Sequence, residues 1–131
     1  MGQRVITIPL PVAGADFTLK ATVPMVVKYV TGVLTTSATV ASRSVSLYYY
    51  DADNNVLCVV GVDGTQAASN SFRYDWSVNA RPWYIAGGAS TVGVLPDVVM
   101  DQRWALKSST FGIQAGDQWS ELFAVAWIDD L

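Results

Sequence analysis

The fold class is decided by residues 43–62, which read RSVSLYYYDADNNVLCVVGV. In the first part of this stretch Val45, Leu47 and Tyr49 share one parity, which is the period of two expected for a half-buried strand. The turn-forming residues DADNN follow, and VLCVVGV then resumes a strand pattern. Two such runs on either side of a short polar segment predict a β-hairpin.

Similar apolar runs, separated by turn residues, lie on both sides of this hairpin. We expect further strands at residues 17–23, 25–35, 71–76, 92–95, 98–100, 104–108 and 119–128. No window shows a convincing helical stripe, and only residues 96–104 could hold a helical turn. Eight to nine strands spaced about ten residues apart predict an all-β protein, a single-domain antiparallel β-sandwich that is jelly-roll-like. An immunoglobulin-like sandwich fits this pattern nearly as well.

The 131 residues suit one domain, preceded by a segment of different character. Residues 1–16 are predicted to form an N-terminal extended arm or edge strand, because Pro9 and Pro11 remove backbone donors that a central strand needs. Residues 17–131 then form the β-sandwich domain. An arm that binds a partner by strand addition would use its apolar side chains, which are Val5, Ile6, Ile8 and Leu10. Deletion of residues 2–13 is therefore expected to leave the sandwich folded.

The composition favours protein–protein contact over other kinds of binding. Hydrophobic residues make up 51% of the chain and charged residues only 15%, against about 25% charged residues in an average domain. Surplus apolar surface ordinarily serves an interface, although a dense core under a Ser/Thr-rich surface is the alternative. The net charge of −3, with scattered basic residues, counts against nucleic-acid binding. No apolar run is long enough to span a membrane, and the first residues lack a signal-peptide core.

The sequence offers few of the features that catalytic sites commonly use. The chain has no histidine, which excludes His-dependent hydrolases and removes the commonest transition-metal ligand. The one cysteine, Cys58, lies in an apolar run and is interpreted as a buried, inert thiol. No phosphate-binding glycine motif is present. We therefore predict a protein that is not an enzyme and that uses no cofactor.

Acidic residues occur at spacings that invite two weaker hypotheses. Asp51, Asp53 and Asn55 resemble the opening of a calcium loop, but the required glycine and glutamate are replaced by valines, so a hairpin turn is favoured. The pairs Asp97/Asp101 and Asp117/Glu121 could be proposed as glycosidase carboxylates. Pairs at this spacing arise by chance in most chains, and no metal site is predicted.

Aromatic residues provide the remaining candidate contacts. The long connection predicted at residues 77–91 is flanked or occupied by Trp76, Trp83 and Tyr84, which could stack on a sugar or enter an interface. Tyr48 and Tyr50 lie on the strand face opposite Val45 and Leu47, so a partner must meet them if no second sheet covers that face. A set of strand tryptophans is expected in the core, namely Trp104, Trp119 and Trp127.

Several segments resemble, in their residue composition and their order along the chain, segments of small β-rich structural proteins of tailed phages. The first is LTTSATVASR at residues 34–43, a strand, a Thr/Ser-rich connection and an arginine that opens the next strand. The others are the acidic turn at 51–55, QAAS at 66–69, Leu95-Pro96 and GIQAGD at 112–117. Together they cover most of residues 34–128. The motifs mark no defined functional residue that could be carried over.

The resemblance implies a structural protein of the virion, assembled in the host cytoplasm. Its leading form is a capsid cement or decoration protein that binds and stabilises the lattice of the major capsid protein, or binds another virion protein. A homo-oligomer, either a dimer or a trimer, suits a lattice axis. The alternatives are a tail or fibre module that recognises a host glycan or receptor, and a head–tail or baseplate joint protein.

Overall fold

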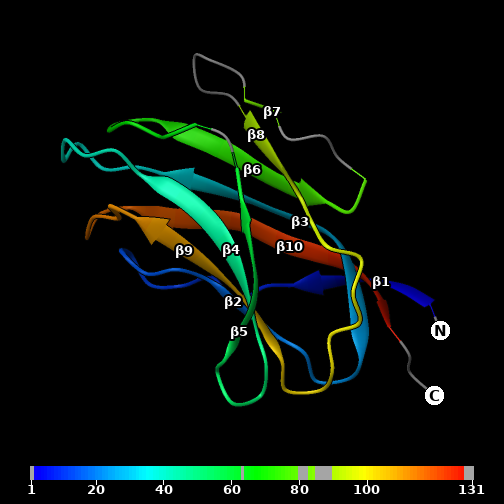
Figure 1. Ribbon diagram of the computed structural model, residues 1–131. Coiled ribbons are helices and arrows are strands. Elements are labelled where there is room, and N and C mark those ends of the chain that lie inside the picture. The colour runs from blue at the N-terminus through cyan, green and yellow to red at the C-terminus, as the bar shows by residue number, and fades with distance from the viewer. Residues whose placement is uncertain (1, 63, 80–82, 85–89, 129–131) are drawn as a thin grey trace.

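In the computed structural model two β-sheets pack face to face, and residues 2–62, 64–79, 83–84 and 90–128 are described (Figure 1). The larger sheet has the strand order β1 (Gly2–Thr7), β10 (Gln118–Ile128), β3 (Met25–Thr35), β6 (Ser71–Ser77), β8 (Ser90–Val94) and β7 (Trp83–Tyr84). The smaller sheet has the order β2 (Thr18–Lys20), β9 (Ala105–Phe111), β4 (Ser44–Tyr50) and β5 (Val56–Gly61). Within these ranges no helix has the length and hydropathy needed to cross a membrane.

The strand pairing is nested around the predicted hairpin. β4 pairs with β5, β3 with β6, β2 with β9 and β1 with β10, each time antiparallel. These nested pairs are divided between two sheets, as in a jelly roll. The predicted jelly-roll-like sandwich is therefore confirmed, with one addition: β8 lies beside β6 in parallel, and the two-residue β7 pairs with β8.

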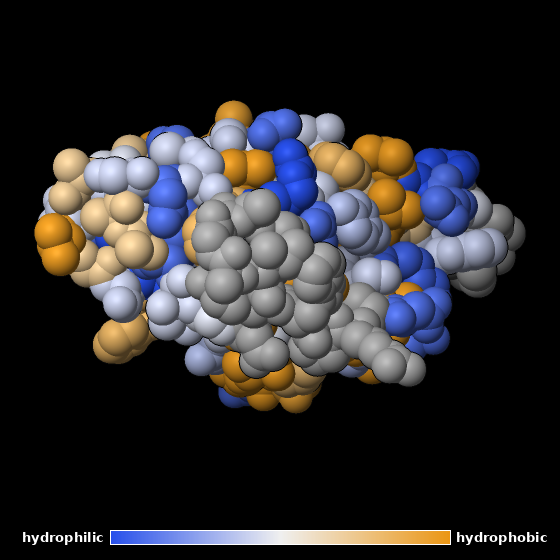
Figure 2. Space-filling model, turned by 90° about the horizontal axis from the view of Figure 1, so that it is seen from above, coloured by the Kyte–Doolittle hydropathy of each residue, from blue (hydrophilic) through white to orange (hydrophobic). Residues whose placement is uncertain are grey.

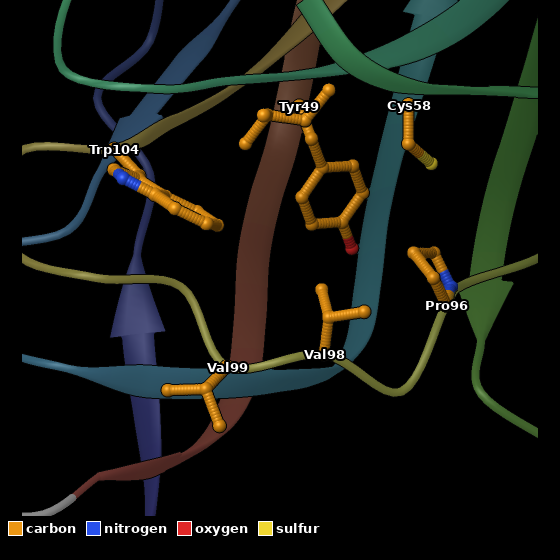
Figure 3. A pocket seen from close by; sticks show the side chains of 7 residues that line it. Tyr49, Cys58, Pro96, Val98, Val99 and Trp104 are labelled. Carbon is orange, nitrogen blue, oxygen red and sulfur yellow. The ribbon is translucent and has the colours of Figure 1, made fainter.

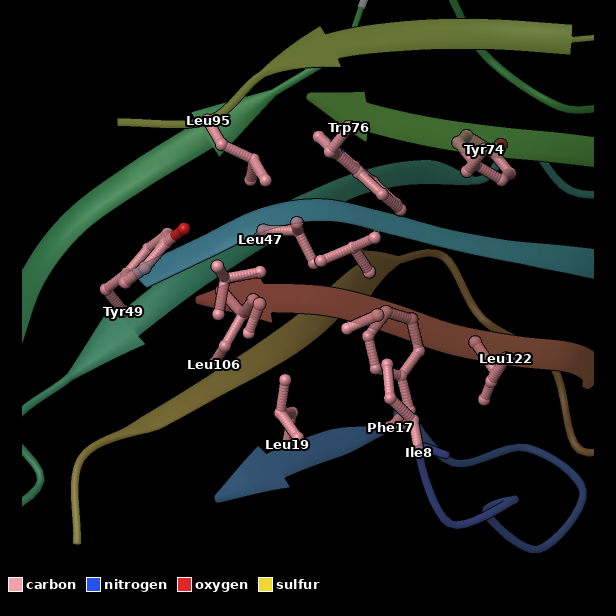
Figure 4. Close-up of a cluster of buried hydrophobic side chains, with 14 of the residues drawn as sticks. Ile8, Phe17, Leu19, Leu47, Tyr49, Tyr74, Trp76, Leu95, Leu106 and Leu122 are labelled. Carbon is pink, nitrogen blue, oxygen red and sulfur yellow. The ribbon is translucent and has the colours of Figure 1, made fainter. Parts of the chain in front are cut away.

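Alternation along the strands builds the core between the sheets. In β4, Val45, Leu47 and Tyr49 are buried while the residues between them are half-exposed. β6 contributes buried aromatic rings in the same manner, and Trp119 of β10 packs edge-on against Phe17 with ring centroids 5.0 Å apart. Figure 4 shows the side chain of Leu47 in the smaller sheet and those of Tyr74 and Trp76 in the larger sheet lying in the space between the two layers. Such interdigitation is the main source of stability in a domain of this size.

Two predicted segments differ from the structure. The connection expected at residues 77–91 contains β7 and the start of β8, which pair with each other and with β6. Residues 98–100, expected as a strand, form only an isolated bridge between Met100 and Met25. Pro96 interrupts this region, and the absence of its backbone N–H prevents a continuous ladder.

A β-bulge in β10 changes which residues face the core. The pairing with β3 shifts between Ser120 and Phe123, and Glu121 adopts a left-handed φ of 51°. Trp119 and Leu122 consequently both point inward, although they are three residues apart. Gly32 lies opposite the bulge, where an added Cβ would come within 2.4 Å of Leu122. A glycine is favoured there because the buried side chains of Leu122 and Trp119 occupy the space that a side chain would need.

Residues 1–16 divide between a paired strand and a connection. β1 pairs along its whole length with β10, from Gly2 opposite Ile128 to Thr7 opposite Phe123. Ile8 follows immediately and is 1% exposed in the core. The edge strand is thus built into the larger sheet, and Ile8 anchors the start of the connection to β2 in the core.

Candidate functional site

An apolar surface, here called the outer strip, crosses the outer face of β1, β10 and β3, where Gln3 and Thr7 of β1 lie opposite two of its members. Register places its side chains on one face: Val5 pairs with Val125, and Val125 with Tyr29. Exposure reaches 72% at Val5, 36% at Phe123 and 42% at Trp127. The outer strip consists of Val5, Val26, Tyr29, Phe123, Val125 and Trp127. Aromatic residues in such a setting are typical anchors of protein interfaces.

A hydrogen-bonded polar cluster borders the outer strip on β3 and β6. The Tyr29 hydroxyl donates to Asp75 Oδ1 at 2.6 Å, and the Thr31 hydroxyl donates to the same oxygen at 2.7 Å. Arg73 donates to Thr31 Oγ1 and lies 3.4 Å from a Glu121 carboxylate oxygen. Partial burial and the hydrogen bond to Asp75 raise the pKa of Tyr29. The apolar strip therefore has a fixed polar rim, the usual anatomy of a binding surface.

The four arm residues predicted to bind a partner do not share one orientation. Val5 belongs to the outer strip, and Leu10 is 63% exposed in the connection after β1. Ile6 lies partly buried against the core, and Ile8 is fully inside it. Successive side chains of β1 point to opposite faces of the sheet, so Val5 faces outward and Ile6 faces the core. Ile8 lies in the core just after β1 ends.

The predicted surface aromatics fall into three groups. Trp76 is completely buried and stacks on Tyr74 with ring centroids 5.8 Å apart, so its prediction as a surface contact is wrong. Trp76 is buried because it shares the core-facing side of β6 with Phe72 and Tyr74. The backbones of Trp83 and Tyr84 form β7, but their side chains lie outside the described part of the structure.

Tyr48 and Tyr50 form the third group, on the outer face of the smaller sheet. Their rings are stacked with centroids 6.0 Å apart, and Lys107 Nζ lies 4.9 Å from the Tyr50 ring centroid. Neither ring is covered by the larger sheet, because both alternate with the buried residues of β4. The pair offers a small flat aromatic platform beside a cation.

A separate apolar hollow, here called the β5 pocket, lies beside the free edge of the smaller sheet. Its volume is about 210 Å³, and its lining residues are Tyr49, Leu57, Cys58, Pro96, Val98, Val99 and Trp104. Figure 3 shows the Tyr49 ring pointing from β4 toward the segment that carries Pro96 and Val98. The Tyr49 hydroxyl is buried, and none of the described residues forms a hydrogen bond with it. Burial raises the pKa of Tyr49, with a smaller effect of Cys58, so the hydroxyl remains a neutral donor.

The acidic residues are engaged in structural contacts. The Asp51 carboxylate accepts hydrogen bonds from the backbone N–H groups of Asp53 and Asn55, each at 2.9 Å, as in a turn. The hydrogen bonds from the backbone and side chain of Asn55, together with the weaker effect of the Asp53 backbone, lower the pKa of Asp51. Asp97 pairs with Lys28 at 3.0 Å, and Asp117 pairs with a buried arginine. Across the residues that the structure describes, no three acidic or cysteine side chains gather as metal ligands would.

Comparison of the chain with known protein families, with curated proteins and with solved structures finds no match. The class that the fold and the surfaces define is a small β-sandwich protein with exposed apolar surfaces. Two candidate binding surfaces result: the outer strip is broad and flanked by polar groups, and the β5 pocket is a local hollow near the edge of the smaller sheet. Figure 2 shows apolar and polar patches alternating over the face seen from above.

Proposed function

We propose that the protein is a structural component of a phage virion, in the first place a cement or decoration protein that binds the major capsid lattice through its outer strip. The observation that carries the proposal is the exposure of Val5, Phe123 and Trp127 on one sheet face. A free protein gains nothing from leaving a tryptophan and a phenylalanine in water, whereas an interface gains from burying them.

The mechanism is mechanical. The outer strip would lie on a surface shared by adjacent capsid subunits, so that only the assembled lattice offers the complete binding site. Binding to the assembled form then stabilises it by mass action. Arg73, Glu121 and Asp75 at the border would set orientation rather than supply most of the affinity, because partly exposed charges contribute little. Many copies on one particle add avidity.

The test is co-sedimentation of the purified protein with capsids that lack it, combined with the temperature at which the capsids break open. We expect saturable binding and a raised disruption temperature. The double variant F123S/W127S should fold, because both side chains point to solvent, and should bind at least roughly tenfold more weakly. The matched control is V40S, since Val40 is 93% exposed in a connection away from the strip.

A second candidate function is recognition of a host glycan, favoured by the stacked Tyr48 and Tyr50 beside Lys107. Aromatic faces of this kind can stack on sugar rings, as the sequence hypothesis for tail and fibre modules requires. Binding to host cells that is lost in Y48A/Y50A and retained in F123S/W127S would support this function. It would also contradict the capsid role if no binding to heads were seen. Binding to isolated tails alone would support the joint protein.

A further inference from the structure

The smaller sheet has an outer face that the larger sheet does not cover, here called the tyrosine face. Directly paired residues share a face, so the strand registers place two rows of outward residues across it. Each row runs from β2 to β5, with a lysine on one side of a tyrosine and a valine on the other. The rows are Thr18, Lys107, Tyr48 and Val59, and then Lys20, Ala105, Tyr50 and Val56.

The tyrosine face carries positive charge at its centre. Lys20 and Lys107 are the only charged residues at its paired outward positions, and they are diagonal neighbours on β2 and β9. Neither lysine forms an ion pair with a described residue. Because the whole chain has a net charge of −3, this positive face differs from the rest of the molecule. Its charge is complementary to that of an anionic partner.

The two tyrosines supply a surface on which a ring can stack. Their ring planes lie 19° apart with centroids separated by 6.0 Å, and both residues are half-exposed. Lys107 Nζ lies 4.9 Å from the centroid of the Tyr50 ring. The face of an aromatic ring is partly negative, so it attracts both an ammonium group and the weakly positive C–H groups of a sugar. A sugar ring that carries a carboxylate matches both parts of this arrangement.

A hollow, here called the β2 hollow, continues the tyrosine face at its β2 edge. Its volume is about 370 Å³, and Thr18 and Lys20 belong both to it and to the tyrosine face. Thr7 and Thr22 also line it, among apolar residues. A hollow of this size with mainly apolar walls and a few polar groups is typical of small-molecule sites. It offers room for further units of a ligand that lies across the lysines.

We propose that the tyrosine face and the β2 hollow together bind an acidic oligosaccharide, of the kind that contains uronic acids. Sugar rings stack on Tyr48 and Tyr50. Their carboxylates pair with Lys107 and Lys20, and the sugar chain continues into the β2 hollow. The inference rests on the second candidate function, for which it names the class of glycan.

Other anionic partners fit this surface less well. The affinity of nucleic-acid binding depends on several contacts between phosphates and basic side chains, and the two rows offer only Lys20 and Lys107. A specific protein interface involves roughly 20–30 residues on each side, many more than the two rows contain.

The position of the tyrosine face is compatible with the proposed role in a particle. The two sheets pack face to face, so the outer strip and the tyrosine face point away from each other (Figure 1). A copy that is bound to a capsid through the outer strip would therefore present the tyrosine face to the surroundings. Both contacts can be made at once.

The experiment titrates the full chain with a mannuronate hexasaccharide and follows the backbone amide signals by NMR, without capsids or cells. The matched probe is mannohexaose, which has the same length but no carboxylates. We expect saturable shifts confined to the smaller sheet and the β2 hollow. The mannuronate hexasaccharide should bind roughly fivefold or more tightly than mannohexaose. Added salt should reduce this difference, because exposed charge pairs are weak and screened.

Three lysine substitutions test where the carboxylates bind. K107Q and K20Q should each weaken binding of the mannuronate hexasaccharide by roughly threefold and leave binding of mannohexaose unchanged. K28Q is the matched control, since it removes the same charge from β3 of the larger sheet and breaks only an exposed ion pair with Asp97. Y48A/Y50A should abolish binding of both sugars, because the stacking surface is lost.

Three results would overturn the proposal: no shift at millimolar mannuronate hexasaccharide, equal affinity for the two sugars, or wild-type affinity in both K107Q and K20Q. Tighter binding of a deoxythymidine hexamer or of hexaglutamate than of the sugar would assign the face to a nucleic acid or to an acidic peptide. Either of these outcomes also rejects the proposal.

The proposed function is scored separately. F123S/W127S should bind the mannuronate hexasaccharide as the wild type does, so failure of the capsid role would leave this result intact. If Y48A/Y50A loses binding to host cells while the wild type does not bind the mannuronate hexasaccharide, host recognition stands and the acidic class of sugar is wrong.

Discussion

Arg43 and Asp117 form an ion pair from which solvent is fully excluded. The guanidinium of Arg43 donates from Nε to Asp117 Oδ2 at 2.9 Å and from Nη2 to Asp117 Oδ1 at 3.0 Å. Both side chains are 0% exposed. Asp117 also accepts from the backbone N–H groups of Ser37 and Gln114. The pair therefore fastens the connection before β4 to the turn before β10.

Acid should weaken the protein through Asp117. Burial alone would raise the pKa of this carboxyl, but the hydrogen bonds from Arg43, Ser37 and Gln114 outweigh it and lower the pKa from 3.8 to about 2. The stabilisation is complete above the ordinary pKa and is lost as the pH falls from about 4 to about 2. It amounts to about 2 kcal/mol. Urea unfolding at a series of pH values measures it.

The D117N variant should lose this acid dependence and unfold more easily at pH 7, by about 3 kcal/mol or more, because Arg43 remains buried without a counter-charge. The matched control is D97N, which breaks the exposed pair with Lys28 and should cost less than about 1 kcal/mol. Equal effects of the two substitutions would contradict the structural role of the buried pair.

Gly112 should not tolerate a side chain. Its φ is 79°, and an added Cβ would lie 2.2 Å from the Ser42 carbonyl oxygen. G112A is expected to lower the free energy of unfolding by about 3 kcal/mol. G61A serves as the control, because nothing lies within 4 Å of its added Cβ, and should change stability by less than about 1 kcal/mol. Thermal melts of both variants provide the comparison.

The bulge residue Glu121 should prefer glycine to a β-branched residue. Its φ of 51° lies in the left-handed region, which valine tolerates poorly. E121V is expected to cost about 2 kcal/mol and E121G to stabilise the protein by up to about 1 kcal/mol. E121Q removes only the charge and should behave as the wild type does. A stable E121V would mean that the bulge does not form as described.

Removal of the first strand should harm the fold. Ile8 is 1% exposed, so I8A is expected to cost about 3 kcal/mol. L10A, at a 63% exposed position two residues later, should cost less than about 0.5 kcal/mol. Deletion of residues 2–13 removes both β1 and Ile8, so we now expect it to destabilise the sandwich. Chemical unfolding of the three variants tests this order.

Strand patterns predicted most of the fold because alternation records which face is buried. Residues 43–62 show it clearly, since one face of β4 meets the core and the other meets solvent. β8 was only partly predicted, because its neighbour β6 pairs with it in parallel and its antiparallel partner β7 has only two residues. The order of the strands within each sheet could not be predicted, because no short stretch of sequence encodes it.

The candidate surfaces were harder to predict from the sequence than the strands were. The main reason is the bulge at Glu121 in β10. Strict alternation places Trp119 and Trp127 on one face, so both were expected in the core. Glu121 adds a residue to β10, which keeps Trp119 inside at 0% exposure and turns Trp127 outward at 42%. The left-handed conformation of a glutamate leaves no mark in sequence, apart from Gly32 on the neighbouring strand. The β5 pocket combines residues of the β4–β5 hairpin with residues from the stretch 96–104, and it was not predicted.

The position of β10 in the larger sheet also bears on when the protein can fold. β10 is the last of the described strands in sequence order, yet it lies between β1 and β3 and joins them. During synthesis the two early strands must wait, unpaired on those sides, until residues 118–128 have left the ribosome. Contacts so distant in sequence form slowly. Nascent chains are therefore exposed to aggregation through their waiting strands, and chaperones would have their greatest effect at this stage.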